Sequence, residues 1–521
     1  MTSSPPKAAV QAVKRILIVN CYIDEFRTPI KRKLKFPQPM APVYLAGIFS
    51  PHRCDVRLYD ELYSGPLENQ CLLSFPDMLV LTGVNVAFDR MLHITAYVKT
   101  KNPRAIVVAG GSAVRAMPLY AKAFFDYACT GDIEQLGDVV EEVFGQDFVA
   151  ESYRATGRAI PRYDLAYWMT TMNFVESSRN CYYRCSYCSL TAEMARYEPY
   201  TPEYLRQQFV ALGKKRMVHF LDNNFASFDR DFVRQRFALM KQLQAEGYLN
   251  MWGAEVTSDF FLNHEYLELA RDCGCVALFC GVESFSKKAL LDFRKYHNNC
   301  LPQVAMIRDC LEAGIAFLYG IVLDPTTRHL ADLRQELDFI VDNPEITLPA
   351  YVTLAIPLLG TPYFYECLEQ RRFLPNIKLR DLDAATLTLK PLDGIHETVR
   401  FVRDLQSFRG YKRRVVRHML GFLRRYHRAL AWDRMGVIQY SALHLCLPKL
   451  ATVGNDIGSL LGYNGRHRFQ RTYVGTTEAL DAVYQPAFRL DSKYEHYFRP
   501  TMLTDKQGNL AEALQPDLLM N

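Results

Sequence analysis

Short apolar runs alternate with segments of helical period along residues 14–150. Four of these runs, rich in β-branched residues or leucine, are the predicted strands: Arg15–Asn20, Asp55–Asp60, Asp77–Gly83 and Ala105–Gly111. Runs that are apolar at nearly every position suit strands covered on both faces, as in a parallel sheet with helices on either side. The pattern therefore predicts an α/β domain with a Rossmann-like, doubly wound parallel sheet.

The loops after these strands form the expected ligand-binding edge, because ligands of such sheets bind beyond the carboxyl ends of the strands. The edge comprises Cys21–Pro42, Gly83–Phe88 and Gly110–Arg115. Gly83, Gly110 and Gly111 are candidate binding residues, since glycine lets the backbone approach a bulky ligand closely. A plain turn of the chain would explain the glycine pair equally well.

After a polar stretch that predicts a linker, the alternation resumes. The predicted strands are Met172–Glu176, Met217–Asp222, Met251–Val256, Val276–Val282, Phe317–Leu323 and Tyr351–Ile356. Helical segments such as Asp229–Gly247 and Leu330–Val341 separate them. Six βα units predict a partial (β/α)6 barrel with its functional groups at the C-terminal ends of the strands.

Beyond Leu392 the strand pattern disappears, and a mostly helical region is expected. The arginine-rich segment Arg409–Met435 places these apolar residues at helical spacing: Val416, Met419, Leu423, Tyr426 and Leu430. It predicts one basic amphipathic helix that packs on its own barrel with solvated arginines. Contact with a membrane surface or an anionic substrate is the second role considered.

Domain boundaries follow from where these patterns change. The predicted parts are a mobile tail over residues 1–13, a Rossmann-like domain over 14–150, a linker over 151–166, a barrel over 167–391 and a mostly helical C-terminal region over 392–521.

The composition is that of a globular protein in a reducing compartment. Hydrophobic residues make up 49% and charged residues 23% of the chain, and no stretch approaches the roughly 20 apolar residues of a membrane span. The N-terminus lacks the apolar segment of a secretory signal, so a cytoplasmic protein is expected. Fourteen cysteines in that compartment serve metal ligation, catalysis or burial rather than disulfides. The net charge of +6 is too modest to imply nucleic acid.

Three cysteines lie close together after the first predicted barrel strand, in the stretch CYYRCSYC. Cys181, Cys185 and Cys188 are spaced so that one short loop can place three sulfurs around a metal centre. A closed zinc site would need a fourth ligand nearby. The next cysteines along the chain are predicted to be buried in or beside a strand: Cys273, Cys275 and Cys280. Iron–sulfur clusters are usually held by four thiolates, so three thiolates leave one iron open for a reactant.

The spacing Cys-x3-Cys-x2-Cys, with Tyr187 before the last cysteine, resembles the motif of the radical S-adenosylmethionine superfamily. The resemblance implies that Cys181, Cys185 and Cys188 hold a [4Fe–4S] cluster and that S-adenosylmethionine binds the open iron. Reductive cleavage would then release a radical that abstracts a hydrogen atom. By the same resemblance Tyr187 shields the cluster and packs near the adenine.

Later segments resemble other parts of the superfamily's barrel. In FLDNNF, the residues Asp222, Asn223 and Asn224 follow the second strand and would hold the methionine amine, although the more usual Gly-Gly-Glu is absent. In CGVESFS, Glu283 would face the cofactor, and a structural ion pair is the alternative. The segments YGIVLDP and AIPLLGTPYFYE resemble the later strand ends.

The domain in front of the barrel resembles that of the cobalamin-binding subfamily. FPQPMAPVYLAGIFS, CDVRLYD, VVAGGSAVR and CTGDIE occur in the order seen there. The resemblance implies a bound cobalamin without a lower histidine ligand, because no Asp-x-His-x-x-Gly segment is present. Some relatives keep the domain without using the vitamin.

The resemblance implies a cobalamin-dependent radical methyltransferase that acts on an unactivated carbon of a small-molecule or lipid-like substrate. A radical cyclase, oxidase or rearrangement enzyme with the front domain as a scaffold is the first alternative, and a metal-stabilised binding protein is the second. The expected partners are an apolar or anionic small molecule and an electron donor such as flavodoxin or ferredoxin, with no nucleic acid. No catalytic residue beyond the cofactor ligands is assigned.

Overall fold

The computed structural model describes residues 13–21, 40–169, 173–194, 196–227, 229–384, 386–406, 410–446 and 484–519. Backbone contacts divide these residues into two compact units. The first unit contains residues 13–21, 40–168 and 484–499, and the second contains the remainder. Three predicted features lie wholly or mostly outside the described residues: the N-terminal tail, the loop after the first strand, and residues 447–483 of the C-terminal region.

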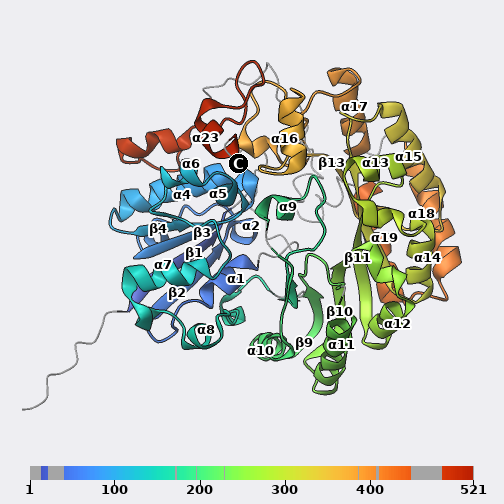
Figure 1. Ribbon diagram of the computed structural model, residues 1–521, viewed down its shortest axis with the longest axis horizontal. Coiled ribbons are helices and arrows are strands. Elements are labelled where there is room, and N and C mark those ends of the chain that lie inside the picture. Colours follow the sequence, from blue (N-terminus) through green and yellow to red (C-terminus); the bar gives the residue numbers. More distant parts are fainter. Residues whose placement is uncertain are drawn as a thin grey trace, which may run out of the picture. The chain divides into compact units, whose positions relative to one another are not determined.

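The first unit is built on a parallel five-stranded sheet in the order β2-β1-β3-β4-β5 (Figure 1). Its strands are β1 (Lys14–Asn20), β2 (Cys54–Asp60), β3 (Met78–Thr82), β4 (Ile106–Ala109) and β5 (Tyr127–Ala128). Its longer helices are α1 (Ala41–Ala46), α4 (Phe88–Lys101), α7 (Gln135–Phe144) and α8 (Glu151–Thr156). The shorter ones are α2 (Glu61–Ser64), α3 (Gln70–Leu73), α5 (Ser112–Ala116) and α6 (Pro118–Lys122).

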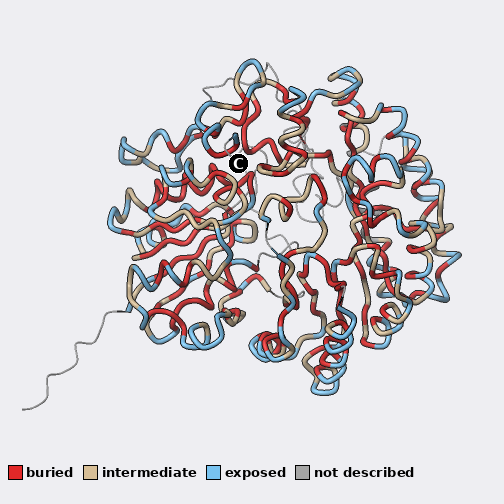
Figure 2. The backbone as a smooth tube through the Cα atoms, viewed as in Figure 1, coloured by how far each residue is buried: buried red, intermediate tan, exposed pale blue. Residues whose placement is uncertain are grey.

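The apolar runs explain why this sheet forms. All four residues from Ile16 to Val19 in the interior strand β1 are fully buried, and Figure 2 shows buried residues along the strands of the sheet. The predicted doubly wound parallel sheet is confirmed. The order places a topological switch point between β1 and β3, and ligands of such sheets bind at that point.

A segment from the far end of the chain packs on the first unit. Tyr484 donates a hydrogen bond to Asp89 of α4 over 2.8 Å, although 395 residues separate them. The Phe498 ring, at the end of the 3-10 helix η7 (Ser492–Phe498), stacks on the buried His93 ring with centroids 4.3 Å apart. No pattern along the chain predicts this return, because it depends on contacts between distant segments.

The second unit contains a parallel six-stranded sheet in the order β13-β12-β11-β10-β9-β6. Its strands are β6 (Asn173–Val175), β9 (Lys215–Phe220), β10 (Leu249–Val256), β11 (Cys275–Glu283), β12 (Ala316–Leu323) and β13 (Tyr351–Leu354). A separate antiparallel pair consists of β7 (Ser178–Arg179) and β8 (Glu198–Pro199). The sheet is open, because β6 and β13 are its two edges. The predicted partial barrel is confirmed, and each predicted strand lies within two residues of the observed bounds.

Helices connect and cover these strands. They are α9 (Ser189–Glu193), α10 (Pro202–Leu212), α11 (Arg230–Ala245), α12 (His264–Asp272), α13 (Lys287–Asp292), α14 (Gln303–Glu312), α15 (Leu330–Asp342) and α16 (Pro362–Glu369), with the 3-10 helix η5 (Tyr296–Asn299) before α14. Side-chain caps define where several begin. The Asp229 carboxylate accepts hydrogen bonds from the amides of Asp231 and Phe232, so α11 starts at Arg230.

The described part of the C-terminal region combines helices with irregular segments. It contains α17 (Ile395–Gln406), α18 (Lys412–Tyr426), α19 (Trp432–Cys446) and α23 (Gln515–Leu518). The prediction of one continuous arginine-rich helix was wrong, because a turn over residues 427–431 separates α18 from α19. Within the described ranges, no helix is long and apolar enough to cross a bilayer.

The predicted apolar stripe of α18 is correct in part. Tyr426 and Leu430 are buried as predicted, but Val416 is 55% exposed, and Val415, His418 and Phe422 are buried instead. Tyr426 donates a hydrogen bond over 2.6 Å to the carbonyl of Glu345, just beyond α15. The helix is rotated to make this contact and to bury an aromatic face that includes a histidine, which a purely apolar pattern does not reveal.

Candidate active site

The three cysteines lie in a loop at the C-terminal end of the first barrel strand. The chain leaves β6, passes through β7 and enters the loop at Cys181. Asn180, just before it, has a φ of 65°, a left-handed conformation that asparagine tolerates better than most residues. The loop ends at Cys188, which is the N-cap residue of α9. All three thiols are therefore presented from one short segment at the predicted rim.

Burial controls the protonation of the three thiols. Cys185 is buried, and Cys181 and Cys188 are partly buried. Burial raises the pKa of Cys185 to about 12 and raises the pKa of the other two, while the nearby Lys295 ammonium acts in the opposite direction. Without a bound metal, burial therefore keeps the three thiols of this loop protonated.

The donor set of the loop consists of three thiols and fits an iron–sulfur cluster. Among the described residues, no three His, Cys, Asp or Glu side chains converge on one metal ion. In a multi-iron cluster each thiolate binds a different iron, so the sulfurs lie further apart than the ligands of one ion. Three cysteines of one loop are the donors that such a cluster requires, with one iron left for another ligand.

A buried ion pair lies beside the cysteine loop. The ammonium of Lys295 is 2.7 Å from the Glu283 carboxylate and donates a hydrogen bond over 3.1 Å to the Tyr187 hydroxyl. Only 6% of Lys295 and 8% of Glu283 is exposed. The ion pair considered for Glu283 is thus present, and its partner is a residue that the sequence did not single out. The pair joins both residues expected to contact the cofactor, Tyr187 and Glu283.

The backbone at Glu283 is unusual for a strand end. Its φ is 62°, and the register of β11 against β12 shifts between Cys280 and Glu283. Such conformations cost free energy and persist where surrounding contacts hold them, often at functional sites. Here the contact with Lys295 holds the carboxylate toward the cysteine loop.

Two tyrosines tie the cysteine loop to neighbouring strand ends. The Tyr182 hydroxyl donates a hydrogen bond over 2.6 Å to Asp259, which follows β10. The Tyr183 ring stacks on His297 of η5 with centroids 3.7 Å apart. Burial, together with the charge of Lys295, lowers the pKa of His297 to about 3, so this ring is neutral at ordinary pH. These contacts fix the loop against the rim of the barrel.

The three polar residues after β9 have different surroundings. Asp222 is fully buried and accepts hydrogen bonds from the hydroxyls of Ser177 and Ser178 at 2.6 and 2.5 Å. Its oxygens therefore hold the segment after β6 against the end of β9. Asn223 is exposed, whereas Asn224 is fully buried and its side-chain oxygen accepts hydrogen bonds from two backbone amides.

At the predicted glycine edge of the first unit, the loop after β3 and the loop after β4 lie in close contact. A Cβ atom on Gly111 would lie 2.4 Å from the carbonyl oxygen of Gly83, and Gly111 has a φ of 107°. A Cβ on Gly110 would meet its nearest neighbour at an ordinary 3.7 Å. Val84 at the same edge is 56% exposed. Gly111 is therefore required by the packing of the loops, and contact of the three glycines with a ligand stays a prediction.

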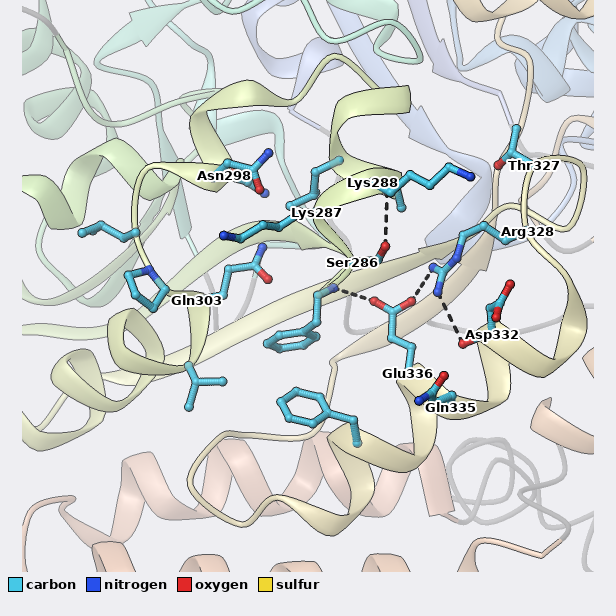
Figure 3. A pocket seen from close by; sticks show the side chains of 18 residues that line it. Ser286, Lys287, Lys288, Asn298, Gln303, Thr327, Arg328, Asp332, Gln335 and Glu336 are labelled. Carbon is cyan, nitrogen blue, oxygen red and sulfur yellow. Dashed lines mark hydrogen bonds and ion pairs between the residues drawn. The ribbon is translucent and has the colours of Figure 1, made fainter.

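A cavity of about 700 Å³ opens at the C-terminal ends of β11 and β12 (Figure 3). The Glu336 carboxylate beside it accepts hydrogen bonds from the Ser284 hydroxyl at 2.6 Å and the Phe285 amide at 2.5 Å, and pairs with Arg328 at 2.5 Å. Neither Glu283 nor any of the three cysteines lines the cavity. The cavity and the cysteine loop are therefore separate features of the same rim.

Fold and site together define an α/β protein whose open parallel barrel presents three cysteines at its C-terminal rim. Comparison with known proteins agrees: residues 175–337, from β6 into α15, match the Radical SAM superfamily. The chain therefore contains a radical SAM domain. Its Cys-x3-Cys-x2-Cys loop lies within the matched residues.

Two relatives carry methylase names. The chain is 24% identical over 337 residues to a hopanoid C-2 methylase of Rhodopseudomonas palustris (strain TIE-1), covering 60% of this chain and 62% of the relative. It is 26% identical over 206 residues to a bacteriochlorophyllide d C-12(1)-methyltransferase of Chlorobaculum tepidum, covering 38% of this chain and 42% of the relative. The chain thus spans less than two thirds of the length of each relative.

The fold of the chain is similar to that of a solved structure. OxsB, a cobalamin-dependent S-adenosylmethionine radical enzyme with aqua-cobalamin and S-adenosylmethionine bound, superposes with a TM-score of 0.57. The sequences are 14% identical, and the likeness covers 88% of this chain and 75% of OxsB. At that coverage the likeness of fold extends over both units of the chain.

Proposed function

We propose that this protein is a radical S-adenosylmethionine enzyme that transfers a methyl group to an unactivated carbon of a small-molecule or lipid-like substrate, with cobalamin as a further cofactor. The observation that carries the proposal is the cysteine loop, which lies at the C-terminal rim of a barrel that matches the radical SAM family. The methylase names of the two relatives support methyl transfer as the outcome.

Each part of the cysteine loop has a role in this proposal. Cys181, Cys185 and Cys188 would hold a [4Fe–4S] cluster, and S-adenosylmethionine would take its open iron. When bound, the cluster and S-adenosylmethionine supply radical generation, and cobalamin supplies the methyl group. Tyr182 and Tyr183 position the loop through Asp259 and His297.

The ion pair beside the loop is the part of the site best suited to a zwitterionic ligand. Lys295 provides a buried positive charge and Glu283 a buried negative charge at one strand end. Tyr187 contacts this ion pair by accepting a hydrogen bond from Lys295. We assign Glu283 and Tyr187 to the nucleotide cofactor, with Asn223 and Asn224 at the end of β9 as further contacts. Asp222 serves this group by holding the ends of the two strands together.

The glycine edge of the first unit is the proposed cobalamin site. Gly83, Gly110 and Gly111 lie at or beside the switch point of the sheet, where ligands of such sheets bind. The three histidines of the unit lie elsewhere: His52 precedes β2, His93 is buried in α4, and His496 is in η7. The proposed cobalamin therefore has no lower histidine ligand from this edge.

One observation favours a second candidate function. OxsB, whose fold the chain shares, is named a cobalamin-dependent radical enzyme, and that name does not specify methyl transfer. A radical oxidation, cyclisation or rearrangement would use the same cysteine loop. The mass of the product separates the two, since methyl transfer adds one methylene to the substrate.

Partners and compartment follow from the same proposal. Reduction of a cluster requires a one-electron donor such as flavodoxin or ferredoxin, and the substrate would be an apolar or anionic small molecule. No nucleic-acid partner is proposed.

The thirteen cysteines that are described are all free, which supports a reducing, cytoplasmic compartment. A peripheral membrane contact is the remaining partner, and its residues are identified below.

Anoxic purification from cells supplied with cobalamin and iron tests the proposal. We expect the protein to carry iron, sulfide and a corrinoid, with absorption bands of both chromophores. Iron without corrinoid would reject the cobalamin assignment and favour the second candidate function. A protein without iron after anoxic reconstitution would reject both.

A further inference from the structure

The arginines of α18 fall into two groups. Arg414 pairs with Asp342 of α15 at 2.7 Å, and Arg425 pairs with Glu345 at 3.0 Å. Four others are exposed and have no ion-pair partner in the part of the chain that the structure describes: Arg413, Arg417, Arg424 and Arg428. The first group attaches the helix to the barrel. The second group makes no ion pair with the described residues, although the charge of Arg417 adds to the hydrogen bond from Arg414 in lowering the pKa of Asp342.

The unpaired arginines share one side of the helix. At about 100° per residue, Arg417 and Arg424 lie within about 60° of Arg413, on the side opposite the buried Phe422. Arg428 lies beyond the helix, in the turn that follows it. Below we call this surface the basic stripe; it consists of Arg413, Val416, Arg417, Leu420, Arg424 and Arg428. Its width and charge follow from the rotation of α18 described above.

The basic stripe also exposes apolar side chains. Val416 is 55% and Leu420 is 52% exposed on the stripe itself. Trp432, just beyond the turn, is 77% exposed at the start of α19. Trp432 follows Arg428, the last residue of the stripe, by four positions in the sequence. Exposed tryptophan, aliphatic and arginine side chains together are typical of a surface that rests at a lipid–water boundary.

We propose that the basic stripe and Trp432 bind the surface of a bilayer that contains anionic lipids. The four arginines complement the lipid phosphates, while Val416, Leu420 and Trp432 enter the headgroup layer. Nucleic acid would also complement the arginines, but it would leave the two aliphatic side chains in water. The inference goes beyond the proposed reaction and does not depend on it.

The position of this surface agrees with a peripheral contact. Arg434 of α19 donates a hydrogen bond to the carbonyl of Gly314, just before β12 begins. The start of α19 therefore lies at the N-terminal end of the barrel strands, opposite the cysteine loop. Binding to a bilayer through this end leaves the C-terminal rim unobstructed.

Flotation of the full-length protein with vesicles tests the inference. One set of vesicles contains phosphatidylcholine mixed with phosphatidylglycerol, and the other contains phosphatidylcholine alone. We expect flotation with the first set, weakened by salt, and little flotation with the second. A variant with glutamine at all four unpaired arginines should bind at least about tenfold more weakly. The matched control replaces four exposed cations elsewhere in the same unit by glutamine: Arg216, Arg230, Lys241 and Arg271.

Tryptophan emission reports the contact directly. The chain has three tryptophans, and Trp168 and Trp252 are fully buried. A blue shift on adding anionic vesicles therefore reports Trp432, and it should be absent from Trp432→Phe. The inference is overturned if the protein does not float with anionic vesicles. It is also overturned if the control variant loses binding as much as the arginine variant, or if the protein binds RNA but no vesicle.

Discussion

The Lys295 ammonium lies 2.7 Å from the Glu283 carboxylate across twelve residues of sequence, and both side chains are buried beside the cysteine loop. Burying two charges is costly unless they remain paired. The pair therefore constrains the loop between β11 and α14 to one arrangement. Because Lys295 also donates to Tyr187, the same arrangement sets the position of the aromatic ring between Cys185 and Cys188.

Removing one partner of this pair should destabilise the protein strongly. In Lys295→Met, Glu283 is left as an unpaired buried carboxylate, and we expect the free energy of unfolding to fall by about 3–5 kcal/mol. The double variant Lys295→Met/Glu283→Gln should recover much of that loss, since no charge remains buried. Urea unfolding of the metal-free variants measures both effects. Equal stability of the single and double variants would contradict a coupled pair, and the exposed Lys287→Met serves as the control.

The two adjacent glycines of the first unit should respond differently to alanine. Gly111→Ala places a Cβ 2.4 Å from the Gly83 carbonyl oxygen at a positive φ, and we expect a loss of about 2 kcal/mol or more. Gly110→Ala meets nothing closer than 3.7 Å and should change stability by less than about 1 kcal/mol. Thermal unfolding of the two variants gives the comparison. If Gly110→Ala were the more damaging, the observed contact between the two loops would be wrong.

Glu176 gives the protein a specific pH dependence. Burial raises the pKa of Glu176 from 4.5 to about 7, and Tyr200 donates a hydrogen bond to it over 2.7 Å. The folded protein holds an extra proton between these two pH values, so this group lowers stability as the pH rises from about 4.5 to about 7. Glu176→Gln cannot ionise and still accepts from Tyr200. We expect it to gain up to about 3 kcal/mol relative to wild type between pH 5 and pH 8.

Urea unfolding at the two pH values measures the difference. Glu203→Gln, a change at an exposed glutamate in the first turn of α10, should leave the pH dependence of wild type unaltered. Identical pH dependence in Glu176→Gln and wild type would show that Glu176 is ionised in the folded protein at pH 5.

Cysteine replacement separates cluster ligands from buried thiols. Cys185→Ala should reduce bound iron after anoxic reconstitution to background, because two thiolates cannot retain the cluster. Cys273→Ala, a change at a fully buried cysteine in the same unit, should retain iron in the wild-type amount. Iron analysis and absorption spectra give the result. Loss of iron in both variants would point to unfolding, and retention in both would remove the cysteine loop from metal binding.

Local pattern predicts the parallel strands well, because a strand covered on both faces is apolar throughout. The run Val276–Val282 predicts β11 to within one residue at each end. The three cysteines are recognised as metal ligands from their spacing alone. Lys295 is not visible in this way, since a lysine is ordinarily exposed and only the fold brings it to Glu283. The sequence does indicate that such a residue exists, because Glu283 ends an apolar strand and its carboxylate needs a cationic partner nearby.

Two further features could not be predicted from the periodicity of apolar residues. The rotation of α18 depends on His418 and Tyr426, which are buried through hydrogen bonds to carbonyl groups near the end of α15. The packing of Tyr484 and Phe498 on α4 joins segments nearly 400 residues apart. In both cases the deciding contact joins residues that lie too far apart in the sequence for a local window to contain both.

Electron paramagnetic resonance of the reduced protein reports whether the three cysteines hold a cluster that S-adenosylmethionine can bind. The full-length chain, reconstituted with iron and sulfide under anoxic conditions and reduced with dithionite, should show the signal of a reduced [4Fe–4S] cluster. Adding S-adenosylmethionine should change that spectrum, because the ligand binds the iron that Cys181, Cys185 and Cys188 leave open. A cluster signal that S-adenosylmethionine does not alter, or no cluster at all, would contradict the account.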